Sequence, residues 1–161
     1  MKKIQIHAGA IILGMHDALV SLTGLISGLT FALANQKIII LSAIIASATA
    51  ALSMGASEYL AEKTRHNKYA IRTGIITSSA YAITCVILLI PFYMTNKTNI
   101  ALLASLAIAV LIIFCCNFFI RRAHNRRWWR HAIEMLIICT IVSVIAFLIG
   151  DVAQKTLGIN I

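Results

Sequence analysis

Five long apolar runs, separated by short polar clusters, dominate the hydropathy pattern of the chain. A helix that crosses the hydrocarbon core of a bilayer needs about 20 mostly apolar residues, and each run has about that length. The alternation of apolar and polar residues that a transmembrane barrel strand requires is scarce. The pattern predicts an all-α integral membrane protein with helices near 8–33, 38–61, 70–92, 98–120 and 131–150.

The composition supports a single transmembrane domain over residues 1–161. Hydrophobic residues make up 60% of the chain and charged residues 12%, more apolar surface than a soluble domain of this size could bury. The formal net charge of +9 comes from Lys and Arg beside the apolar runs, so no nucleic-acid partner is expected. No nucleophile, base and orienting group share one depth, so neither an enzyme nor a cofactor is expected.

The positions of the positive charges predict the orientation in the membrane. Eleven of the 14 Lys and Arg residues precede the first helix or fall between the second and third or the fourth and fifth helices. The other three, Lys37, Lys97 and Lys155, fall on the opposite side. Because cytoplasmic loops carry an excess of Lys and Arg, we expect a cytoplasmic N-terminus and an outside C-terminus. A bacterial inner membrane or a vacuole-like membrane fits this multi-pass topology.

The acidic residues carry the candidate chemistry. The chain has only five, namely Asp17, Glu58, Glu62, Glu134 and Asp151. An ionised carboxylate near the bilayer centre costs about 2.5 to 3.5 kcal/mol, so it persists where it faces a partner, a cavity or a pathway. Asp17 lies about nine residues, or roughly 13 Å, into the first helix and is the strongest candidate. Glu134 is expected in an interfacial ion pair and Asp151 in solvent at the outer end.

Two residues of the second helix extend this candidate site. Met54 and Glu58 lie one turn apart on the same face, and Met54 lies roughly 10 Å from the cytoplasmic end of the helix, near the depth of Asp17. The three side chains can converge if the first two helices pack together, and Glu62 completes the candidate set of metal ligands. One thioether among carboxylates suits a divalent metal of intermediate softness, with iron(II), manganese(II), cobalt(II) and zinc(II) all open.

Small residues predict how the helices pack. The first helix has a small and polar stripe that consists of Gly14, Asp17, Ser21, Gly24 and Gly28. The second helix has a similar stripe that consists of Ala43, Ser47, Ala50 and Met54. Small residues let helix backbones approach closely in a membrane. We therefore expect the first and second helices to pack through these stripes, and the GxxxG pair Gly24 and Gly28 to form a homodimer interface.

At these residues the chain resembles the vacuolar iron transporter family, which includes shorter nodulin-21-like members. The segment HDALVS at 16–21 is similar to the first-helix pattern of the family, and ALSMGASEY at 51–59 is similar to its second-helix signature. Weaker similarities follow at LIPF (89–92) and FLIG (147–150).

The resemblance implies a five-helix homodimer that exchanges cytoplasmic iron(II) or manganese(II) for protons, along a path between the paired first and second helices. Asp17 and Met54 would be the transmembrane ligands, and Glu58 the ligand at the cytoplasmic entrance. The chain departs from the family at Ala18, where glycine is usual. It also lacks the Glu- and Met-rich cytoplasmic domain that many members carry between the second and third helices, where this chain has only residues 62–69.

Two other functions compete with metal transport. A non-transporting membrane scaffold or assembly protein would use the same stripes only for packing. A transporter of organic cations would bind the charge of its substrate through Asp17 or Glu58, but the aromatic residues that such a site favours are almost absent from the stripes.

Overall fold

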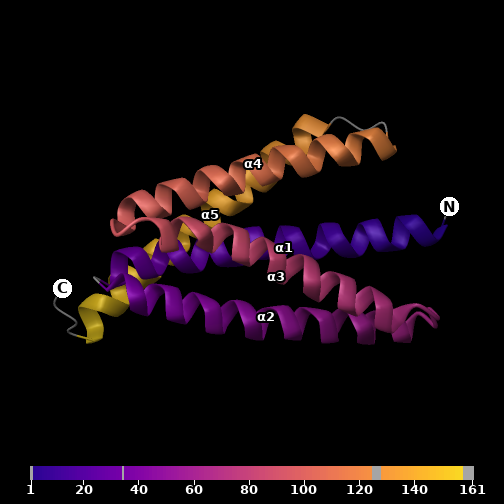
Figure 1. The fold of residues 1–161 in the computed structure, drawn as a ribbon, viewed down its shortest axis with the longest axis horizontal. Coiled ribbons are helices and arrows are strands. Elements are labelled where there is room, and N and C mark those ends of the chain that lie inside the picture. Colours follow the sequence, from indigo (N-terminus) through magenta and orange to yellow (C-terminus); the bar gives the residue numbers. More distant parts are fainter. Residues whose placement is uncertain (1, 34, 125–127, 158–161) are drawn as a thin grey trace.

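Five long α-helices, joined by short connections, make up the computed structural model of the chain (Figure 1). The structure describes the backbone of residues 2–33, 35–124 and 128–157, and the side chains of 8–33, 35–116 and 132–156. The helices are α1 (Lys2–Ala32), α2 (Gln36–Thr64), α3 (Ala70–Met94), α4 (Thr98–His124) and α5 (Trp128–Leu157). Each contains a stretch of 19 to 29 residues that is long and apolar enough to cross a membrane, and the described residues contain no strand. The prediction of an all-α membrane protein with five spanning helices is confirmed.

Several helices extend beyond the apolar runs that predicted them. Helix α1 begins at Lys2 rather than near residue 8, and α5 continues to Leu157 rather than ending near residue 150. Hydropathy marks only the part of a helix that lies in hydrocarbon, whereas the backbone hydrogen bonds continue into the polar flanks. At the start of α2, the Asn35 side chain accepts a hydrogen bond from the Lys37 N–H at 3.0 Å and so caps the helix.

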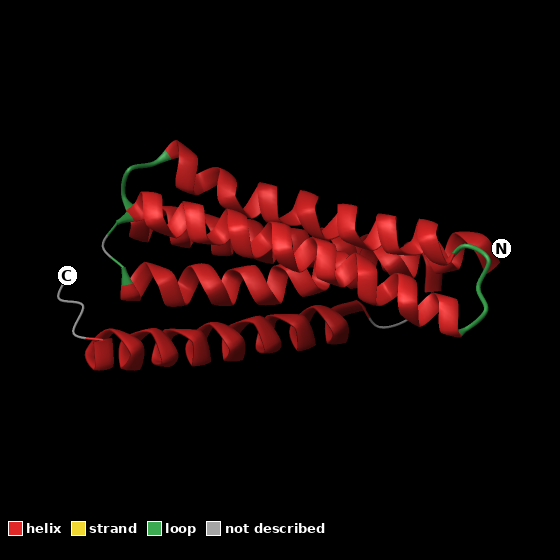
Figure 2. Cartoon of the chain, turned by 90° about the horizontal axis from the view of Figure 1, so that it is seen from below, coloured by secondary structure: helices red, strands yellow, loops and turns green. Residues whose placement is uncertain are grey.

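The helices form one antiparallel bundle in which α1 and α3 have central positions. Helix α1 packs mainly against α3 and α5, and α2 packs mainly against α3. Helix α1 begins at the same end of the bundle as the turn between α2 and α3, while the α1–α2 and α3–α4 connections lie at the opposite end (Figures 1 and 2). The largest fully buried side chains include Tyr81, Leu88 and Phe92 of α3 and Leu19, Leu22 and Ile26 of α1.

The expected packing of the first helix against the second is wrong in part, because the two helices touch but each packs more closely against α3. A β carbon on Gly14 would clash with the Thr77 carbonyl of α3, and one on Gly55 would lie 2.7 Å from Ser78 Cβ. Helices α1 and α2 therefore both pack closely against α3, and they contact each other less.

The expected role of Gly24 and Gly28 as a dimer interface is also wrong. A β carbon on Gly24 would lie 2.8 Å from Val142 Cγ1, and one on Gly28 would lie 2.9 Å from the Ala146 carbonyl oxygen. Both neighbours belong to α5 of the same chain. The GxxxG pair therefore holds α1 against α5 and is not available to a second copy.

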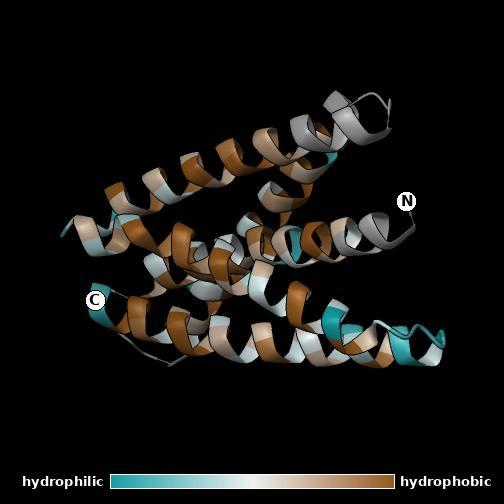
Figure 3. Ribbon diagram, turned by 45° about the vertical axis from the view of Figure 1, so that its right-hand side comes forward, coloured by the Kyte–Doolittle hydropathy of each residue, from teal (hydrophilic) through white to brown (hydrophobic). Residues whose placement is uncertain are grey.

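Polar and charged residues gather at the ends of the bundle, as Figure 3 shows in teal at the α2–α3 turn. The exposed basic side chains at this turn are Lys63, Arg65, Lys68 and Arg72. Those near the opposite end are Lys37, Lys97 and Lys155. The orientation was also predicted from seven basic residues that lie outside the described side chains, namely Lys2, Lys3, Arg121, Arg122, Arg126, Arg127 and Arg130. The cytoplasmic side of the bundle therefore stays a prediction.

Candidate functional site

Asp17 lies within the membrane-spanning part of α1, on a surface that the other helices leave uncovered. Leu13, Asp17 and Ser21 are all exposed, whereas Ala18 and Leu19 are completely buried. Because the three exposed residues are four positions apart, they line up along one side of the helix. We call these three residues the exposed strip of α1.

A buried tyrosine of α3 reaches this strip. Tyr81 is 2% exposed, and its hydroxyl oxygen lies 2.6 Å from Ser21 Oγ. Ser21 Oγ in turn donates a hydrogen bond to the backbone carbonyl of Asp17 at 2.7 Å. The Asp17 carboxylate lies within electrostatic range of the Tyr81 hydroxyl. A polar contact between α1 and α3 therefore adjoins the carboxylate.

This polar region continues toward α2 through Cys85, one turn beyond Tyr81 on α3. The Cys85 thiol is 2% exposed and lies beside the Tyr81 and Ser47 hydroxyls, within electrostatic range of Asp17. Ser47 belongs to the stripe that was expected to meet α1 directly. In the structure, α3 joins the two stripes instead.

Met54 and Glu58 lie one turn apart on α2, and both are half-buried. Met54 packs against the buried apolar core of the bundle. Gly14 of α1 and Gly55 of α2 both contact α3 within residues 74–81, so these two glycines lie at about the same depth. Asp17 follows Gly14 by less than one turn, and Met54 adjoins Gly55. Asp17 and Met54 therefore lie within roughly two turns of each other along the bundle.

The structure does not gather the predicted ligands into one cluster within a single chain. Among the described side chains, no group of three His, Cys, Asp or Glu residues is arranged to hold a metal ion. Asp17 is on α1 while Met54 and Glu58 are on α2, and these two helices contact each other less than either contacts α3.

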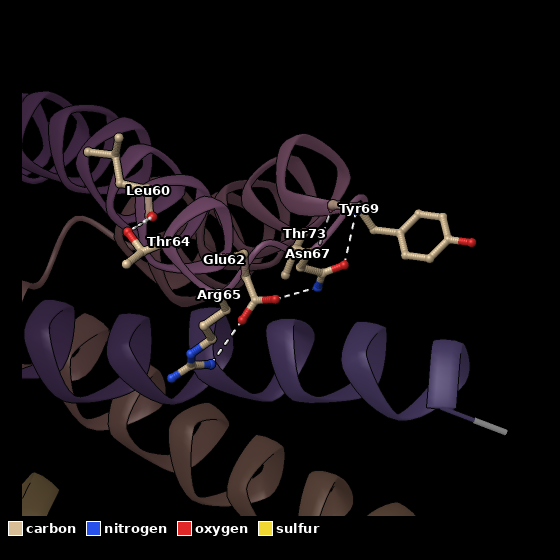
Figure 4. Close-up of polar contacts among 7 residues, drawn as sticks. All are labelled: Leu60, Glu62, Thr64, Arg65, Asn67, Tyr69 and Thr73. Carbon is tan, nitrogen blue, oxygen red and sulfur yellow. Dashed lines mark hydrogen bonds and ion pairs between the residues drawn. The ribbon is translucent and has the colours of Figure 1, made fainter.

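Glu62, the fourth candidate ligand, lies in the last turn of α2, and residues of the α2–α3 turn bind its carboxylate (Figure 4). Its carboxylate is almost fully buried and accepts hydrogen bonds from Arg65 Nη1 at 2.9 Å and from Asn67 Nδ2. The backbone carbonyl of Glu62 accepts a bond from the Asn67 N–H at 3.0 Å, and Asn67 Oδ1 accepts one from the Tyr69 N–H at 3.0 Å. These bonds hold the end of α2 against the start of α3.

The two remaining acids lie away from this region. The Asp151 carboxylate, expected in solvent, is partly exposed and accepts a bond from Lys155 Nζ at 2.7 Å near the end of α5. Glu134 is exposed near the start of the α5 span.

The sequence analysis missed the contribution of α3. Thr73, Thr77, Tyr81 and Cys85 recur every four residues along this helix, and all four are buried. Residues at this spacing lie on one face of a helix, so the polar pattern was available in the sequence. The acidic residues do not point to this helix, because α3 contains none.

Comparison with known proteins adds a match to one protein family. The matching family model is described as the VIT family, and it aligns with residues 8–70 and 62–151 of the chain. These two overlapping segments extend from Ala8 of α1 to Asp151 of α5. They include Asp17, Met54, Glu58 and Glu62. The comparison with curated proteins found no match.

Proposed function

The chain belongs to the VIT family, the vacuolar iron transporter family, and we propose that it carries iron(II) or manganese(II) out of the cytoplasm. Family membership and the five spanning helices make it a multi-pass membrane protein suited to metal-ion transport. The identity of the metal, the direction of transport, proton antiport and the homodimer are the further parts of the proposal.

The observation that carries the proposal is the position of the Asp17 carboxylate. It lies on the exposed strip of α1, within a segment that spans the membrane. None of the ion pairs found among the described side chains includes Asp17. A carboxylate in hydrocarbon costs about 2.5 to 3.5 kcal/mol unless it meets a counter-charge or water. A cation that moves past α1 would supply that counter-charge.

A homodimer that pairs the exposed strips of two copies would complete the path. The strip is polar at Asp17 and Ser21 and is left uncovered by the chain's own helices. If Met54 and Glu58 of each copy also line this path, it would contain four carboxylates and two thioethers. This ligand set suits iron(II) and manganese(II) better than magnesium, because sulfur is a poor ligand for hard cations.

Proton antiport follows from competition for the same oxygen atoms. A carboxylate binds either a proton or the metal, so each divalent cation that enters the path releases protons. This exchange of metal for protons requires no titratable group other than these carboxylates.

Metal flux into liposomes that contain the purified protein tests the proposal. Asp17→Asn keeps the size of the side chain and one oxygen ligand but removes the charge. It should slow iron(II) and manganese(II) flux by about tenfold or more and flatten the pH dependence. The control is Asp151→Asn, which removes a carboxylate near the end of α5 and should leave both unchanged. Parental flux and pH dependence in Asp17→Asn would refute the proposed path, and no flux by the parental protein would favour a scaffold.

Met54→Leu tests the soft ligand. The substitution keeps most of the side-chain volume and removes the sulfur, so flux of iron(II) should fall more than flux of the harder manganese(II). Met135→Leu, at a half-buried position on α5, is the matched control. An unchanged ratio of iron to manganese flux in Met54→Leu would remove Met54 from the set of ligands.

A further inference from the structure

The hydroxyl of Ser21 has an unusual environment for a serine within a membrane helix. Ser21 is an exposed residue on the same strip as Asp17, one turn beyond it along α1. Its oxygen takes part in two hydrogen bonds, one to the Asp17 carbonyl at 2.7 Å and one with the Tyr81 hydroxyl at 2.6 Å. The directions of these two bonds determine whether the Ser21 oxygen still has a proton to donate or a lone pair to accept with.

Counting protons fixes both directions. A backbone carbonyl can only accept, so Ser21 must donate its single hydroxyl proton to the Asp17 carbonyl. In the second bond Ser21 is then the acceptor, and Tyr81 must be the donor. The Ser21 oxygen has two lone pairs, and Tyr81 occupies one of them. The other lone pair remains, and no proton on this oxygen is left to repel a cation.

The Tyr81 side chain holds this arrangement in place. Tyr81 is 2% exposed, and its backbone N lies 3.1 Å from the position of a β carbon on Gly14. Because the ring is enclosed by packed side chains, its hydroxyl has little freedom to turn away from Ser21. Ser21 is thereby oriented before a cation arrives.

We propose that Ser21 is a neutral oxygen ligand for the transported divalent cation, one turn beyond Asp17, and that Tyr81 is the residue that positions it. This inference rests on the proposed function, because it assumes that the cation passes along the exposed strip. A neutral ligand next to a charged one is suited to a transport path, where each step must bind the ion and then release it.

Measuring the affinity for the cation distinguishes a ligand role of Ser21 from a role in helix packing alone. Ser21→Ala removes the oxygen, and Tyr81→Phe removes only the hydroxyl that orients it. Each should raise the KM for manganese(II) flux in liposomes by about fivefold, with a smaller effect on the maximal rate. Because both substitutions disable the same ligand, the double variant should be no worse than Ser21→Ala alone. Ser21→Thr keeps a hydroxyl group on Cβ, so its affinity for the cation should stay close to that of the parental protein.

Tyr93→Phe is the matched control, since Tyr93 is an exposed tyrosine near the end of the same helix. It should leave KM unchanged. Thermal melting of every variant in detergent should stay near the parental value, which shows that the bundle is intact. An unchanged KM in Ser21→Ala, while Asp17→Asn loses flux, would overturn this inference and leave the proposed function standing. A parental protein that carries no metal would overturn both.

Discussion

Gly28 of α1 and Gly150 of α5 meet backbone to backbone, so closely that a β carbon on Gly150 would lie 2.8 Å from the Gly28 carbonyl oxygen. The rings of Phe31 and Phe147 make an edge-to-face contact beside this crossing, with their centroids 4.8 Å apart. Lipid tails compete equally well for apolar surface, so helices in a bilayer associate through such close packing. This crossing therefore contributes to the stability of each chain.

Gly150→Ala should lower the free energy of unfolding by about 1–3 kcal/mol, because the added methyl group must push α5 away from α1. Thermal melting of the purified protein in detergent measures the effect. Gly9→Ala is the control, since a β carbon there would have no neighbour within 4 Å, and it should melt at or slightly above the parental temperature. Equal melting of the parental protein and Gly150→Ala would contradict the close crossing.

Cysteine cross-linking should locate the interface between two copies on the exposed strip of α1. In a variant without the four native cysteines, Leu13→Cys should form a dimer on mild oxidation, because two-fold pairing of the strips brings both copies of this position together. Val144→Cys, on an exposed position of α5, should remain monomeric. Cross-linking at residue 144 and not at residue 13 would move the interface to α5.

Substitution of Glu62 should affect stability and not metal affinity. Glu62→Ala removes the acceptor of both the Arg65 and Asn67 bonds, and the loss should cost about 1–3 kcal/mol of unfolding free energy. Most of that comes from Asn67, because an exposed arginine such as Arg65 adds little. Glu58→Ala should show the opposite pattern, with a raised KM for manganese(II) flux and nearly parental melting. A raised KM in Glu62→Ala would restore Glu62 as a ligand.

The predicted orientation can be tested by labelling single cysteines in intact cells. His66 and Lys97 are exposed in the turns at the two ends of α3, which spans the membrane between them. With a cytoplasmic N-terminus, a membrane-impermeant maleimide should label Lys97→Cys and leave His66→Cys unlabelled until the cells are opened. The reverse pattern would invert the topology and with it the direction of transport.

Some features of the candidate site could be predicted from sequence because they depend on single helices. The rarity of acids singled out Asp17, and its location in an apolar run placed it in the membrane. The four-residue spacing put Met54 and Glu58 on one face of α2. The part played by Tyr81 could not be predicted in this way, because its contact with Ser21 joins two residues of different helices that are 60 positions apart in the chain.

Hydropathy alone determined that this protein is a bundle of five membrane-spanning helices, because the cost of placing polar groups in hydrocarbon acts on each segment independently. Tertiary structure alone decided which helices are neighbours. A glycine stripe shows that another backbone can approach but not which one, and here α5 covers Gly28 while α3 covers Gly14. The choice depends on the fit between complete helix surfaces. Only that fit leaves the strip around Asp17 uncovered and brings the Tyr81 hydroxyl beside it.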